Sequence, residues 1–171
     1  MRIADFNALT EREAANAVGP CVAIDSFVDT VVSGRPYADL DSLLAHAAAQ
    51  TDEWTDSEVE HALAAQPPAG ERVAGGGLSA RLGRKEHAGL DREDAVLLAR
   101  LREATARYEA RFGHAYVVRA AGRTPEQLLA LVEKRLDHDR ATELRTAKEQ
   151  LGEIALLRLQ GLFESSGGVV G

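Results

Sequence analysis

The chain has 171 residues and a mass of 18.3 kDa, the size of one ordinary domain with a hydrophobic core. Its formal net charge of −7 and pI near 5.3 argue against a general binder of nucleic acids or anionic membranes. The single cysteine, Cys21, excludes an intramolecular disulfide and a cysteine-based zinc site, and we expect it to be buried.

The sequence carries no membrane-spanning or targeting signal. No stretch approaches the roughly 20 apolar residues of a membrane helix. Residues 1–6 lack the apolar run of a signal peptide, and residues 165–171 have the composition of a flexible tail without a targeting tripeptide. We therefore expect a cytoplasmic protein that does not bind membranes.

Helix signals begin near the N-terminus. Thr10 and Glu13 have the spacing of a capping box, in which each side chain binds the backbone N–H of the other residue. The next helix is predicted from about Cys21 to Ser33, because apolar residues recur there at helical spacing and Gly34 follows as a stop signal.

Two more helices are predicted before a loop. Asp39 or Asp41 can cap the first of them. The segment Thr55–Glu58 caps the second, which we expect Pro67 to end. Residues 67–78 include three consecutive glycines and are predicted to form a loop.

The second half of the chain is also helical in pattern. A short helix is expected over about 79–88, followed by a long one from Asp91 that Gly113 closes. Residues 115–118 form a brief apolar extended run, too isolated to found a sheet.

Two further helices complete the predicted fold. Thr124 is a predicted N-cap followed by Pro125 at the first helical position, and the last helix is expected over about 140–163. The prediction is an all-α, compact single-domain bundle of about eight helices over residues 1–164, with 165–171 as a flexible tail.

Four stretches of the sequence resemble segments of one protein family, in the same order and at the same spacing. The most specific is Tyr-x-x-Arg-Phe-Gly-x-x-Tyr-Val-Val at residues 108–118. The other three are residues 6–9 with Arg35-Pro36-Tyr37, residues 62–70, and residues 83–89. Together with Arg135-Leu136 and residues 153–159, they resemble the OHCU decarboxylases. These enzymes convert 2-oxo-4-hydroxy-4-carboxy-5-ureidoimidazoline to (S)-allantoin and carbon dioxide in urate catabolism. The resemblance implies a cofactor-free homodimer that acts on this small molecule.

Decarboxylation defines what such a site must contain. Loss of carbon dioxide leaves an electron pair on carbon, so the enzyme must stabilise charge and deliver a proton. Without a cofactor, carbonyl and C=N groups of the substrate ring must accept the electrons. The protein then supplies a cation, a group that exchanges protons, and hydrogen bonds.

Arg158 is the candidate cation. It follows Ile154 by four residues and Leu151 by seven, which places it on the apolar stripe of the last predicted helix. A buried guanidinium must be paired, so spacing alone favours a structural ion pair. The resemblance implies instead that Arg158 binds the anionic part of the substrate.

Glu86 is the candidate for proton exchange. It follows Leu82 by four residues in the predicted short helix, where burial would raise the pKa of its carboxyl group. The alternatives are a pair with Arg158 and a solvated surface charge. The resemblance implies a catalytic glutamate at this position.

Gln66 departs from the family, which has histidine before Pro67. Glutamine donates and accepts hydrogen bonds but cannot act as an acid or base. His87 stands where the family has glutamine, so the two residue types are exchanged. His87 either supplies the imidazole that position 66 lacks or is an exposed surface residue.

The remaining predicted substrate contacts come from the resemblance alone. They are Pro67, Gly83 in place of the family's serine, and the backbone of Val117 and Val118. No histidine has carboxylate or cysteine neighbours at convincing ligand spacing, so we expect no metal ion.

Two alternatives to the decarboxylase remain from the sequence. One is a catalytically silent or re-purposed family member that binds a ureide-like ligand. The other is a lyase that acts on a different heterocyclic acid. The departures at positions 66 and 83 motivate both.

Overall fold

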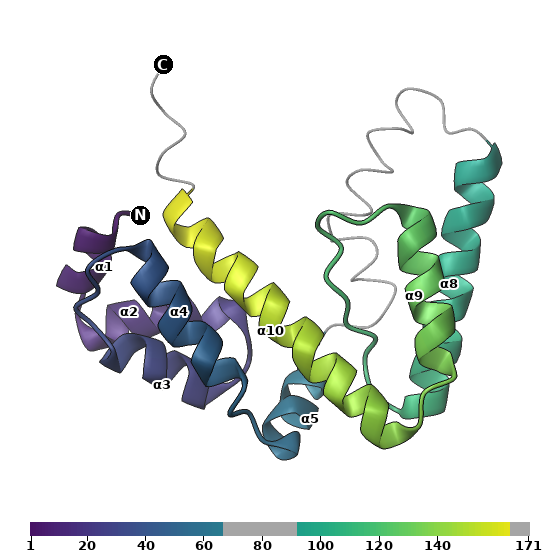
Figure 1. The fold of residues 1–171 in the computed structure, drawn as a ribbon, viewed down its shortest axis with the longest axis horizontal. Helices are drawn as coiled ribbons and strands as arrows, with labels where there is room; N and C mark the ends of the chain where they lie inside the picture. Colours follow the sequence, from purple (N-terminus) through teal and green to yellow (C-terminus); the bar gives the residue numbers. More distant parts are fainter. Residues whose placement is uncertain (67–91, 165–171) are drawn as a thin grey trace. The chain divides into compact units, whose positions relative to one another are not determined.

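The computed structural model describes residues 1–66 and 92–164, which contain eight α-helices, one 3-10 helix (η1) and no strand (Figure 1). The predicted all-α fold is therefore confirmed. The loop predicted over 67–78 and the helix predicted over 79–88 lie outside the described residues. The elements are α1 (Ile3–Ala8), α2 (Glu11–Val18), η1 (Gly19–Cys21), α3 (Asp25–Ser33), α4 (Leu40–Thr51), α5 (Asp56–Ala64), α8 (Arg92–Phe112), α9 (Pro125–Leu136) and α10 (Arg140–Glu164).

These residues form two compact units. In its described part, the first unit contains residues 1–62 and 148–164, and the second contains residues 63–66 and 92–147. The prediction of a single domain over residues 1–164 stays a prediction.

The predicted helix caps in the N-terminal half are confirmed. The Thr10 amide donates to Glu13 Oε2 at 2.9 Å, and the Glu13 amide donates to Thr10 Oγ1 at 3.2 Å. Thr55 and Glu58 make the same reciprocal pair at the start of α5. Of the two aspartates considered for α4, Asp39 is the cap and accepts from the Ser42 amide.

The predicted start of the second helix at Cys21 is wrong. Residues 19–21 form the 3-10 helix η1, and Val22 then has extended backbone with φ of −162°. The α-helix begins only at Asp25 and ends before Gly34, as predicted. This extended backbone places the Val22 side chain in the core, so tertiary packing overrides the helical spacing of the apolar residues in this segment.

The first unit has an aromatic and aliphatic core. Helix α3 packs against both α2 and α4. Phe6, on the short helix α1 that the sequence did not predict, meets Phe163 of α10 edge to face, with ring centroids 5.5 Å apart. Phe27 and Trp54 make a second such pair at 5.9 Å. The contact between Phe6 and Phe163 stabilises α1, which is too short to be stable by itself.

In the second unit, α8 and α9 lie side by side (Figure 1). Gly113 ends α8 with φ of +74°, as the sequence predicted, and the chain continues through residues 115–118 without forming a strand. The core of this unit consists of Leu101, Ala104, Tyr108, Phe112, Tyr116, Leu128, Leu129 and Val132.

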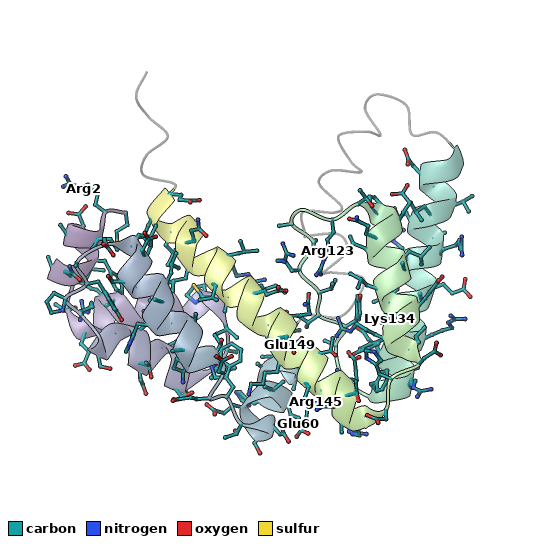
Figure 2. All side chains as sticks on the ribbon, viewed as in Figure 1. Arg2, Glu60, Arg123, Lys134, Arg145 and Glu149 are labelled. Atoms are coloured by element: carbon teal, nitrogen blue, oxygen red, sulfur yellow. The ribbon has the colours of Figure 1, made fainter. Side chains whose placement is uncertain are left out.

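Charged side chains lie mainly on the surface. Lys134, Arg145 and Glu149, which are labelled in Figure 2, are all exposed. Arg135, next to Lys134 on α9, is instead 2% exposed. None of the helices formed by residues 1–66 and 92–164 combines the length and apolar character that crossing a membrane requires.

Candidate active site

The structure describes half of the predicted site. Gln66, Val117, Val118 and Arg158 belong to the described residues, whereas Pro67, Gly83, Glu86 and His87 lie outside them. Arg158 belongs to the first unit, and the other three described residues belong to the second. The geometry of each is therefore described within its own unit.

Arg158 is exposed, which corrects the prediction of a guanidinium on the core face of its helix. The buried stripe of this part of α10 runs through Leu151, Ala155 and Leu159, so Arg158 lies at its edge. Nη1 donates to the backbone carbonyl of Cys21 at 3.3 Å. Among the described residues, no carboxylate pairs with Arg158, so the structural ion pair favoured by spacing is absent there.

The hydrogen bond to the Cys21 carbonyl holds the Arg158 guanidinium in a defined position. The carbonyl lies at the end of η1 and uses one guanidinium N–H, which leaves further donors of the same group for a ligand. Cys21 is itself buried, as predicted, and this burial raises the pKa of its thiol to about 11 despite the nearby positive charge.

Gln66 lies two residues after the end of α5 and is half-buried. Its backbone amide donates to the Leu63 carbonyl at 3.2 Å, which continues the helical turn beyond Ala64. Among the described residues, its side-chain amide has no hydrogen-bond partner. Gln66 therefore presents both a donor and an acceptor at the point where the described chain leaves α5.

Val117 and Val118 lie in the extended segment between α8 and α9. Val117 is buried, and Val118 is partly buried against the core of the second unit. The Val117 carbonyl accepts a hydrogen bond of 2.7 Å from Nη1 of Arg135. The backbone predicted to contact substrate is thus held by a buried cation.

Arg135 is part of a buried polar cluster. Its Nε and Nη2 donate to Glu143 Oε1 at 2.8 and 2.5 Å, and Glu143 is fully buried. Tyr108 donates its hydroxyl hydrogen to the same carboxylate oxygen. Burial alone would lower the pKa of Arg135, but its hydrogen bonds to Glu143 and its electrostatic attraction to Tyr116, Glu143 and Tyr108 together outweigh this effect and raise that pKa. Arg135 is therefore charged.

Tyr116 and His138 complete this cluster. The guanidinium carbon of Arg135 lies 4.6 Å from the centroid of the Tyr116 ring, a distance typical of a cation–π contact. Burial raises the pKa of Tyr116 to about 12. Nδ1 of His138 lies 3.1 Å from Glu143 Oε2, so each carboxylate oxygen of Glu143 has a partner.

The sequence contains a signal for the buried position of Arg135. Arg135 follows Val132 by three residues and Leu128 by seven, which is the apolar stripe of α9. The criterion applied to Arg158 thus identifies Arg135 as the buried arginine. Its partner Glu143 comes from the next helix, and helical spacing cannot reveal a contact between two helices.

Known proteins share this fold and sequence pattern. Residues 7–160 match the family model for OHCU decarboxylase, which covers most of the chain. The chain belongs to the OHCU decarboxylase family. It is 31% identical over 134 residues to a 2-oxo-4-hydroxy-4-carboxy-5-ureidoimidazoline decarboxylase from Haloferax volcanii, and the match covers 78% of each chain. It is 30% identical over 167 residues to the protein of that name from Amia calva, covering 96% of this chain and 95% of the relative.

A solved structure supports the fold. A crystal structure of (S)-allantoin synthase superposes with a TM-score of 0.69 at 17% identity. The superposition covers 95% of the present chain and 54% of that one, so this chain spans about half of the synthase. At this identity the likeness establishes the shared fold, and chemistry must be argued from residues.

Proposed function

We propose that this protein decarboxylates 2-oxo-4-hydroxy-4-carboxy-5-ureidoimidazoline to (S)-allantoin and carbon dioxide in urate catabolism. The family match over residues 7–160 is the observation that carries this proposal. The relatives from Haloferax volcanii and Amia calva bear the name of this decarboxylase, and they align over most of their length.

Arg158 is the proposed substrate-binding cation. Its exposed side chain is tethered to the Cys21 carbonyl, which reduces the number of conformations that a ligand must freeze out. A guanidinium can bind a carboxylate through two parallel hydrogen bonds. In the reaction, the bond between the ring carbon and the carboxylate breaks, carbon dioxide leaves, and the ring C=N and carbonyl groups accept the electron pair.

Glu86 is the proposed proton carrier, and it delivers a proton to the ureido-bearing ring carbon, next to the hydroxyl-bearing carbon that loses carbon dioxide and becomes a carbonyl. Gln66 is proposed to orient the substrate, because its amide donates and accepts hydrogen bonds without exchanging protons. His87 is proposed to supply the imidazole that position 66 lacks. Pro67, Gly83 and the backbone of Val117 and Val118 are proposed to shape the remainder of the site.

We also propose that the enzyme is a cytoplasmic homodimer without a metal or organic cofactor. The single cysteine is buried and cannot form an intramolecular disulfide, which suits a reducing compartment. The dimer rests on the family resemblance. Light scattering after gel filtration tests it, and a mass of one 18.3 kDa chain at micromolar concentration would contradict it.

The direct test follows substrate generated in situ from urate, with and without the protein. The wild-type protein should accelerate loss of the substrate above the spontaneous rate. Arg158→Gln should lower kcat/KM roughly 10- to 100-fold, the range expected for losing hydrogen bonds between charged groups. Arg145→Gln, which removes an exposed arginine from the same helix, is the matched control and should leave the rate unchanged.

The outcomes separate the proposal from its main alternative. The absence of acceleration by folded wild-type protein would contradict the decarboxylase. Saturable binding of (S)-allantoin in that case would favour a silent, ligand-binding family member, which the acid–base inertness of Gln66 specifically suggests. Equal activity of the Arg158 and Arg145 variants would remove Arg158 from the site.

A further inference from the structure

The peptide group between Val117 and Val118 has a fixed orientation. Its carbonyl accepts the 2.7 Å hydrogen bond from Arg135 Nη1, and the peptide bond is trans. In a trans peptide, the carbonyl and the following N–H point in opposite directions. Arg135 therefore turns the Val118 N–H away from the guanidinium. Among residues 1–66 and 92–164, nothing accepts a hydrogen bond from this N–H.

The guanidinium that sets this orientation cannot rotate freely. Glu143 Oε1 binds both Nε and Nη2, while Nη1 binds Val117, so the planar fork is held on two edges. The centroids of the Tyr116 and Tyr108 rings lie 4.6 and 5.4 Å from the guanidinium carbon of Arg135. A side chain held at this many points keeps the Val117–Val118 peptide in one place.

Stability alone does not account for such an arrangement. Burying two charges costs several kcal/mol, and well-packed apolar residues often replace a buried ion pair without loss of stability. An apolar pair, however, could not bind the Val117 carbonyl. What the arginine adds is control of backbone direction in a segment that has no secondary structure of its own.

We propose that Arg135, held by Glu143, is a positioning residue for the decarboxylation. It fixes the Val117 carbonyl and thereby aims the Val118 N–H at a ring oxygen of the substrate that takes up charge as carbon dioxide leaves and that (S)-allantoin retains. A preoriented N–H stabilises charge that develops in the transition state without reorganising. This inference rests on the proposed function, and it assigns no contact between Arg135 and substrate.

Arg135→Lys tests the proposal, because lysine keeps the charge but cannot bridge Glu143 and Val117 with a planar fork. We expect kcat to fall roughly 10- to 100-fold with KM changed less than about threefold, somewhat below the cost of deleting an oxyanion-hole donor. Lys134→Gln is the neighbouring surface control. Leu129→Ala destabilises the same core and controls for loss of stability alone.

The results distinguish the two proposals. Inactive wild-type protein overturns the proposed function and this inference with it. Active wild-type protein with kcat of Arg135→Lys within twofold of Leu129→Ala overturns the positioning role and leaves the decarboxylase intact.

A second measurement uses the unaltered protein, in case Arg135→Lys does not fold. Titration with (S)-allantoin, followed by amide NMR, should shift the Val118 amide proton downfield as its N–H becomes hydrogen-bonded. A saturating titration that shifts other amides but leaves that of Val118 unchanged would refute the inference.

Discussion

Two glycine-to-alanine substitutions should change stability in opposite directions. Gly113 ends α8 with φ of +74°, whereas Gly161 lies within the helix α10. Beyond the neighbouring backbone, an added methyl group would meet no atom within 4 Å at either position, so packing between elements is not a variable. The comparison isolates backbone conformation.

The magnitudes follow from the two backbone states. Alanine narrows the unfolded ensemble and, at a compatible position, stabilises a protein by about 0.4–1 kcal/mol, which is the expectation for Gly161→Ala. At Gly113 the same gain is opposed by about 1–2 kcal/mol for placing a side chain in the left-handed region. We expect Gly113→Ala to be destabilising by about 1 kcal/mol.

Urea unfolding monitored by circular dichroism measures both effects. Gly122→Ala, at φ of +77° in the same unit as Gly113, is a replicate that should also be destabilising. Stabilisation by Gly113→Ala, or equal effects at Gly161 and Gly113, would contradict this explanation and with it the turn that leads into residues 115–118.

Three further predictions concern a cap, the thiol and the missing histidine. Thr124→Ala removes the capping box with Gln127 and should cost about 1 kcal/mol in urea unfolding, while an unchanged midpoint would count against the cap. Burial raises the pKa of the Cys21 thiol from 9.0 to about 11, so alkylation at pH 8 should be about 100-fold slower than for an ordinary thiol. The free energy of unfolding should fall as the pH rises from 9 to about 11, because over that range the thiol loses its proton in the unfolded chain but keeps it in the folded protein. Rapid alkylation of folded protein would contradict that burial. Gln66→His should raise kcat, because it restores a side chain that exchanges protons; an unchanged kcat, measured on substrate generated from urate, would indicate that position 66 needs no such side chain.

The sequence predicted those parts of the fold that depend on neighbouring residues. The capping boxes at Thr10 and Thr124 need only residues three positions apart, and the structure contains both. The stop at Gly113 likewise depends on one residue that tolerates positive φ. Such features are encoded within one helical turn.

The errors concern packing between distant segments. The predicted helix start at Cys21 failed because Val22 is buried in an extended turn, and α1 was missed because its stability comes from the contact between Phe6 and Phe163. Both depend on residues far away in the chain, which local periodicity does not represent.

The candidate site, too, combines features that the local sequence indicates with contacts that it does not. Its residue types were proposed from family resemblance, and Arg158 then proved to be exposed rather than on a core face. The Arg135–Glu143 pair was missed because it joins two helices across a turn, although the position of Arg135 on an apolar stripe indicated that it is buried. Helical spacing shows which face a residue occupies but not what faces it.

We propose that this chain is a stereospecific decarboxylase even though glutamine occupies position 66. Circular dichroism of substrate generated in situ from urate tests it most directly, since spontaneous decay yields racemic allantoin. We predict that the signal of (S)-allantoin appears faster than spontaneous decay and exceeds the racemic background. Racemic product formed at the spontaneous rate, in the presence of folded protein, would contradict the account.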